Sequence, residues 1–110
     1  LAFGSDAPIE VINPFTGIHA AVTSRRPDGT PGPLGWHPAQ RLTVAEAVRA
    51  YTTGPAYAGY MEACQGQLAP GYLADLIVLD RDIFTIDPMD IVNTQVVATL
   101  VNGIFRHRTI

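Results

Sequence analysis

The residue best suited to chemistry in this sequence is Asp6, which lies in the segment Phe3-Gly4-Ser5-Asp6-Ala7-Pro8. The apolar run Leu1 to Phe3 predicts the end of a buried strand that opens into a loop at Gly4. A single carboxylate at such a point suits a metal ligand or a general base. The alternative is local, because an aspartate before Ala7-Pro8 can cap a turn by bonding backbone amides two residues further on.

Trp36 and His37 are candidates for substrate contacts. They lie in the segment from Ser24 to Pro38, whose many prolines and glycines cannot continue a helix or a central strand. Long loops of this kind often carry function. Arg25 and Arg26 in the same loop could bind a substrate carboxylate in bidentate fashion, although paired charges on a loop are more often only solvated.

The residues alone do not supply a complete metal site or nucleophilic site. A zinc site needs three or four converging ligands, yet the chain has no His-x-His or His-x-x-x-His, and Cys64 is its only cysteine. We expect His19 to be a partly buried or surface helix residue and His107 a solvated tail residue. Neither a Gly-x-Gly-x-x-Gly nor a Gly-x-Ser-x-Gly motif is present, so dinucleotide binding and serine-hydrolase chemistry have no local support.

Length and charge exclude several classes of protein. The 110 residues suffice for one modest domain or the tail of a larger one, but a closed eight-stranded barrel needs about 250 residues. Because the formal net charge is −3 and there is no lysine, we expect no nucleic-acid partner. No apolar stretch is long enough for a membrane span, and a lone cysteine fits a reducing compartment, so we expect a cytoplasmic location. The first residue, Leu1, suggests a processed or cloned fragment.

The first half of the chain should be helical. Asn13-Pro14 is a good helix start, and Phe15, Ile18 and Val22 then share one face. A capping box at Thr43 and Glu46 predicts a second helix over about 44–53, which Gly54-Pro55 should stop. A further short helix is expected within 55–63.

The last part should be rich in β-structure from Gly66 onward. The continuous apolar run between Asp75 and Asp80 predicts a buried strand. The segment from Val96 to Val101 alternates and is followed by Asn102-Gly103 and another apolar pair. Asn-Gly between apolar runs predicts a β-hairpin, because both residues accept positive φ.

Five ordered motifs, spread from residue 3 to residue 103, closely resemble the C-terminal end of metal-dependent amidohydrolases, in particular the amidohydrolase 3 (YtcJ-like) family, and the resemblance runs over almost the whole chain. They are Phe3 to Pro8, Gly35 to Pro38 with Arg41 to Ala47, Thr52 to Ala56, Gly66 to Asp80, and Val101-Asn102-Gly103.

The resemblance implies an α/β plus β fold: the C-terminal fragment of a (β/α)8 TIM-barrel hydrolase with strands of its flanking composite β-sandwich. Residues 1–65 would be the last barrel strand and its helices, and residues 66–110 part of the sandwich. Asp6 matches the family's active-site aspartate, near a divalent metal, for which zinc is the expectation. There it would accept a proton from the hydrolytic water, acting as a base rather than a nucleophile. The implied substrate is a small-molecule amide or cyclic amide.

The sequence departs from the family by lacking its histidine ligands and any lysine. We therefore expect the parent protein to hydrolyse carbon-nitrogen, non-peptide bonds and the isolated chain to be inactive. A barrel strand without neighbours exposes edges, so we also expect self-association or pairing with the missing N-terminal part of the barrel. The competing hypothesis is a standalone, non-catalytic binding or dimerisation module in which Asp6 is only a turn residue.

Overall fold

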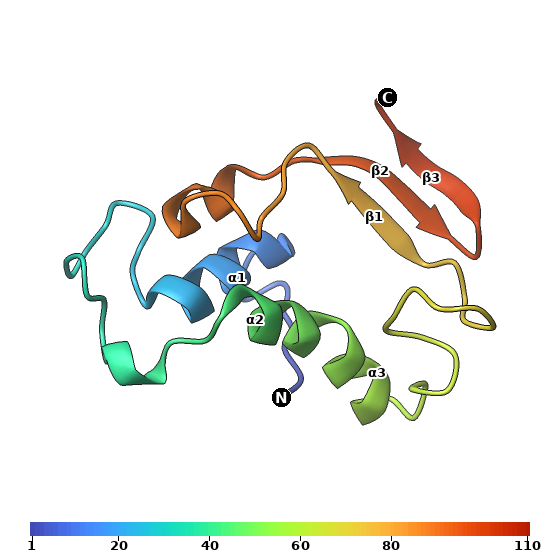
Figure 1. Cartoon of the computed structure of the whole chain (residues 1–110), viewed down its shortest axis with the longest axis horizontal. Coiled ribbons are helices and arrows are strands. Elements are labelled where there is room, and N and C mark those ends of the chain that lie inside the picture. The colour runs from blue at the N-terminus through green and yellow to red at the C-terminus, as the bar shows by residue number, and fades with distance from the viewer.

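The computed structural model describes residues 1–110 and shows helices in the first half followed by a three-stranded antiparallel sheet (Figure 1). Short 3₁₀ helices η1 and η2 lie in the connections. The elements in chain order are α1 Pro14–Thr23, η1 Pro38–Gln40, α2 Val44–Tyr51, α3 Thr53–Ala58, β1 Leu76–Leu79, η2 Pro88–Asn93, β2 Val96–Val101 and β3 Ile104–Arg108.

Helix α1 begins where the sequence predicts. The side chain of Asn13 accepts a hydrogen bond from the backbone N–H of Phe15 at 2.9 Å, which satisfies one of the free amides at the helix start. Phe15 and Ile18 are buried and Val22 is partly buried, so the predicted apolar face is confirmed. The helix ends at Ser24, whose backbone has a φ of 51°.

The capping box of α2 is confirmed, but the expected stop after it is wrong. The hydroxyl of Thr43 accepts from the N–H of Glu46 at 3.2 Å, and the Glu46 carboxylate accepts from the N–H of Thr43 at 2.8 Å. Gly54 and Pro55 do not end the helical region, because they lie inside α3, whose first turn needs no N–H donor from a proline. The axis breaks at Thr52 instead, with φ −123° and ψ −84°. The further short helix expected within 55–63 is therefore present, but it spans Thr53–Ala58.

The predicted hairpin is confirmed, since β2 and β3 join through Asn102 and Gly103 with φ values of 50° and 74°. The sheet order is β1-β2-β3, so β1 pairs with β2 alone. As a result, the prediction of a buried strand at β1 is only half right. Ile77 is 47% exposed and Val78 is 38% exposed, because no neighbouring layer covers that part of the edge strand.

The acids that bracket β1 fasten its ends to the hairpin. Asp75 accepts a hydrogen bond from the N–H of Asn102 at 2.7 Å, and Asp80 accepts from the N–H of Gln95 at 2.9 Å. Arg81, which forms a salt bridge to Asp80 at 2.8 Å, and then the Gln95 bond lower the pKa of Asp80 to about 2. Asp80 is therefore charged at neutral pH and committed to the fold.

The run from Leu1 to Phe3 forms no strand, which corrects the sequence prediction. A strand needs a hydrogen-bonded neighbour, and all pairing in this chain is among β1, β2 and β3. The N–H of Phe3 instead donates to the carbonyl of Ala50 on α2 at 2.7 Å. The Phe3 ring packs edge-on against Tyr51, with ring centroids 5.5 Å apart.

The core is small and lies where α1, α2 and η2 meet. Its buried members are Phe15, Ile18, Ala47 and Ile91, with Leu79 and Val96 of the sheet packed against them. No helix has the length and apolar character that crossing a membrane would require.

Candidate functional site

Asp6 begins a tight turn, and its carboxylate is left without a partner. The carbonyl of Asp6 accepts from the N–H of Ile9 at 2.9 Å, and Asp6 has a φ of 54°, a conformation that aspartate tolerates better than most residues. The side chain is exposed and makes no hydrogen bond within the chain. The hydroxyl of Ser5, rather than the Asp6 carboxylate, accepts from the N–H of Ala7 at 3.3 Å. The side-chain cap that the sequence offered for Asp6 is thus made by Ser5.

The segment before Asp6 is held against the helices. Besides the Phe3 contacts with Ala50 and Tyr51, the carbonyl of Leu1 lies so close to Gly54 that the site has no room for a Cβ atom. Glycine at this position of α3 therefore lets the N-terminal segment approach. These contacts fix where the Asp6 turn leaves the helical layer.

The side chains of this chain do not form a metal site by themselves. No group of three or more His, Cys, Asp or Glu side chains converges anywhere in residues 1–110. A zinc site needs three or four such ligands, so this donor set does not fit one. Asp6 could supply at most one ligand, and the others would have to come from residues outside this chain.

Trp36 and His37 lie together on the loop between α1 and η1. Their rings pack edge-on with centroids 5.4 Å apart, and both residues are exposed. The N–H of Trp36 donates to the carbonyl of Ser24 at 2.8 Å, and the Ser24 hydroxyl donates to the carbonyl of Trp36. Two bonds in opposite directions therefore fix the backbone of Trp36 to the end of α1.

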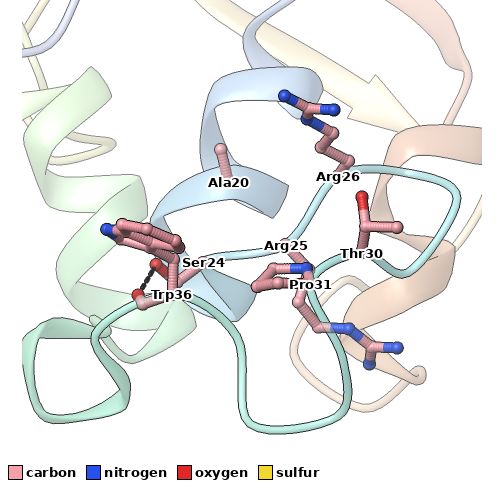
Figure 2. Close-up of a pocket in the computed structure, with 7 residues that line it drawn as sticks. All are labelled: Ala20, Ser24, Arg25, Arg26, Thr30, Pro31 and Trp36. Carbon is pink, nitrogen blue, oxygen red and sulfur yellow. Dashed lines mark hydrogen bonds between the residues drawn. The ribbon is translucent and has the colours of Figure 1, made fainter.

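Trp36 lines a cavity of about 540 Å³ (Figure 2). Neither Asp6 nor His37 is among the residues that line it, so the structure does not gather the predicted site residues into one pocket. The lining consists of Ala20, Ser24, Arg25, Arg26, Thr30, Pro31 and Trp36. Both arginines and the tryptophan were predicted from the sequence as candidates for substrate contacts. Ser24 and Thr30 were not, because the only nearby pattern is the turn dipeptide Asp28-Gly29.

A larger open groove of about 830 Å³ runs between helices α2 and α3 and the sheet. Tyr51, Ile77, Phe84 and Leu100 are among its apolar lining residues. None of the predicted site residues contributes to it.

Comparison with protein families gives a match that covers nearly the whole chain. The model of the Amidohydrolase family matches residues 1–106. The Asp6 turn, the Trp36 loop, the helices and most of the hairpin all lie within the matched range. No solved structure matches the chain significantly.

Three curated proteins are similar over almost all of these residues. The chain is 40% identical over 102 residues to "Putative amidohydrolase YtcJ" of Bacillus subtilis (strain 168), which covers 93% of this chain and 19% of that protein. It is 35% identical to "Protein LONG AFTER FAR-RED 3" of Arabidopsis thaliana, over 94% of this chain and 17% of that protein. It is 31% identical to "N-substituted formamide deformylase" of Arthrobacter pascens, over 97% of this chain and 19% of that protein. The chain thus spans less than a fifth of the length of these relatives.

Proposed function

Because the chain belongs to the amidohydrolase 3 family, as the match over residues 1–106 shows, we propose that it is the C-terminal part of a metal-dependent hydrolase. The bond cleaved is a carbon-nitrogen bond other than a peptide bond, in a small amide or cyclic amide. The names of two relatives support this chemistry, since one is a putative amidohydrolase and another a formamide deformylase. The chain by itself is inactive in this proposal, because its own side chains do not form a metal site.

Asp6 is the general base of the proposed reaction. The observation that carries this role is its exposed carboxylate, which the turn leaves free of any hydrogen bond within the chain. A general base must lie within hydrogen-bond reach of the proton that it removes. A carboxylate that is not already hydrogen-bonded can make that contact with a hydrolytic water and accept its proton. The metal, for which zinc is the proposal, would be held mainly by residues outside this chain.

The proposed parent is a (β/α)8 barrel with a composite β-sandwich. Residues 1–65 would belong to the barrel and residues 66–110 to the sandwich, which agrees with helices in the first part and a sheet in the second. The unpaired segment at Leu1–Phe3 would then find its strand neighbours in the barrel. Trp36 and His37 are proposed to contact the substrate from their loop.

The test of the proposed function is the variant Asp6→Asn in the longest natural chain that carries these residues. With N-substituted formamides, cyclic ureas and N-acyl amino acids as substrates and measured metal content, we expect kcat to fall by about 10²-fold or more. Metal content and thermal unfolding should change little. The matched control is Glu10→Gln, which removes one exposed negative charge four residues further on and should leave turnover intact. Turnover retained in Asp6→Asn would refute the assignment of the base.

A second candidate function has one observation in its favour. Large apolar side chains such as Ile77, Ile104 and Phe105 are exposed on the sheet, which suits a non-catalytic binding or dimerisation module. The two functions are separated by the assay above. If the longest natural chain binds no metal and hydrolyses none of these substrates, the module is the better assignment.

A further inference from the structure

We propose that Arg26, together with Trp36 and Arg25, binds a small carboxylate carried on a flat apolar group, in the cavity at the C-terminal end of α1. The cavity measures about 540 Å³, within the range of small-molecule sites, and Ala20 and Pro31 supply apolar wall (Figure 2). This site goes beyond the proposed hydrolysis, because Asp6 does not line it. It is a separate place for an anionic ligand.

The positive charge of Arg26 in this cavity is not paired with any acidic group of the chain. The guanidinium of Arg26 makes no hydrogen bond and no salt bridge, and the only salt bridge of the chain joins Arg81 to Asp80. Asp28 is near enough for Arg26 to act on its charge, but its carboxylate already accepts two hydrogen bonds from Thr30, at 2.9 and 2.7 Å. Those bonds direct Asp28 to Thr30, so the donors of Arg26 remain free for a ligand.

Arg25 has a different role in the cavity. Its Nε donates to the carbonyl of Gly29 at 3.1 Å, which anchors the side chain to the loop. Figure 2 shows the side chains of Arg25 and Arg26 pointing to different sides of the chain. A single carboxylate therefore engages one guanidinium, and Arg26 is the one whose donors are all unused, because Nε of Arg25 is already bonded to Gly29. Arg25 adds a second positive charge to the same cavity.

Another part of the cavity wall is the largely exposed indole of Trp36, which stands on a fixed backbone. Trp36 is 66% exposed, although its own backbone is bonded in both directions to Ser24. The other arm of the loop is closed by the bond from the N–H of Arg26 to the carbonyl of Thr30 at 2.8 Å. A site whose backbone is already ordered loses less entropy when a ligand binds.

These features select the ligand's chemistry. A guanidinium matches a carboxylate in bidentate geometry, and an indole face or edge favours a flat apolar group. An aryl carboxylate satisfies both at once. Inorganic phosphate would satisfy only the charge and leave the indole uncovered.

Trp36 is the only tryptophan of the chain, so all tryptophan fluorescence comes from a residue that lines this cavity. We expect titration of the 110-residue chain with benzoate at low ionic strength to give a saturable change in emission. Benzamide, which has the same ring but no charge, should give none. Phosphate should bind at least about tenfold more weakly than benzoate, because it lacks the contact with the ring. Equal binding of benzamide, or of phosphate, would overturn the proposed ligand class.

Variants of Arg26 test whether its guanidinium binds the carboxylate of benzoate. Arg26→Gln should raise the dissociation constant for benzoate by about tenfold or more, and Arg26→Lys should do so less, because it keeps the charge without the bidentate fork. The matched control Arg106→Gln removes an exposed arginine of β3, outside the cavity, and should have little effect. Far-UV circular dichroism checks that all variants keep the same fold. An unchanged dissociation constant in Arg26→Gln at equal circular dichroism would refute the site, whatever the outcome for Asp6.

Discussion

Burial forces His19 toward its neutral form. The residue lies on α1 with 1% of its surface exposed, and its Nε2 atom has no hydrogen-bond partner. Burial in the first place, and the charge of Arg25 in the second, lower the pKa of His19 below its usual value. The unfolded chain therefore takes up a proton at a higher pH than the folded chain does.

This difference predicts a pH dependence of stability with a definite sign. The stabilising effect of a neutral His19 is complete above the unfolded pKa of about 6.5 and is lost as the pH falls from there to the folded pKa. Each unit of difference between the two pKa values costs about 1.4 kcal/mol of unfolding free energy at acid pH. Urea unfolding at pH 5.5 and 7.5 should show this loss in the native chain and not in His19→Leu. The control His107→Gln, at an exposed position of β3, should keep it; an equal loss in His19→Leu would contradict the assignment.

At the same scale, the residue types that could do chemistry were visible in the sequence, but their partners were not. Asp6 could be marked because it follows an apolar run, yet only the structure shows that Ser5 takes the capping bond and leaves the carboxylate free. Arg26 could be marked as a charge on a loop, yet its freedom depends on Asp28 bonding to Thr30. The first outcome follows from Pro8, which lies two residues after Asp6 and has no N–H to donate, whereas Ser5 has Ala7 at that spacing. The second turns on competition among neighbouring polar groups, which spacing alone does not resolve.

At the scale of the elements, the contact between the N-terminal segment and α3 holds the residues that precede Asp6, and this role can be tested. A Cβ at Gly54 would collide with the backbone of Leu1, whereas a Cβ at Gly4 would meet nothing within 4 Å. Gly54→Ala should therefore detach Leu1–Phe3, even though alanine favours the helix by about 1 kcal/mol. The measurement is hydrogen exchange of the Phe3 amide, which is bonded to Ala50. We expect protection to fall about tenfold in Gly54→Ala and to persist in Gly4→Ala; equal protection in the two variants would contradict this view of the segment.

Elements defined by local chemistry were predicted well from the sequence. The cap at Asn13, the capping box at Thr43 and the Asn102-Gly103 turn each depend on residues within a few positions of one another. One error was local, because Gly54-Pro55 fits the first turn of α3 and does not stop the helical region. The other errors came where pairing or burial over long range decides. The run at Leu1–Phe3 is apolar enough for a strand but finds no strand neighbour, and β1 is apolar throughout but has an uncovered face.

For the whole molecule, the exposed surface is larger than its mass accounts for. A folded monomer of 11.8 kDa is expected to expose about 5,900 Å², whereas this chain exposes 7441 Å². Its radius of gyration is 14.7 Å, against about 13 Å for a typical domain of this length. Only 11 of the 110 residues are buried, so the core of Phe15, Ile18, Ala47 and Ile91 leaves much of the apolar surface uncovered. The excess of roughly 1,500 Å² is comparable with the total area of a standard protein interface.

Such a surface predicts that the isolated chain associates, and that the exposed apolar residues of the sheet form the contact. Ile77 on the edge strand β1 and Ile104 on β3 are 47% and 56% exposed, and both belong to strands with an unpaired edge. Sedimentation velocity at micromolar concentration should show dimers or larger species, and the double variant Ile77→Lys/Ile104→Lys should shift them toward the monomer. The single variant Leu34→Lys places one lysine on a 70% exposed leucine of the distant loop and should leave the distribution unchanged. If the native chain sediments as a uniform monomer, its exposed sheet is stable in water without a partner. That result would contradict the predicted association.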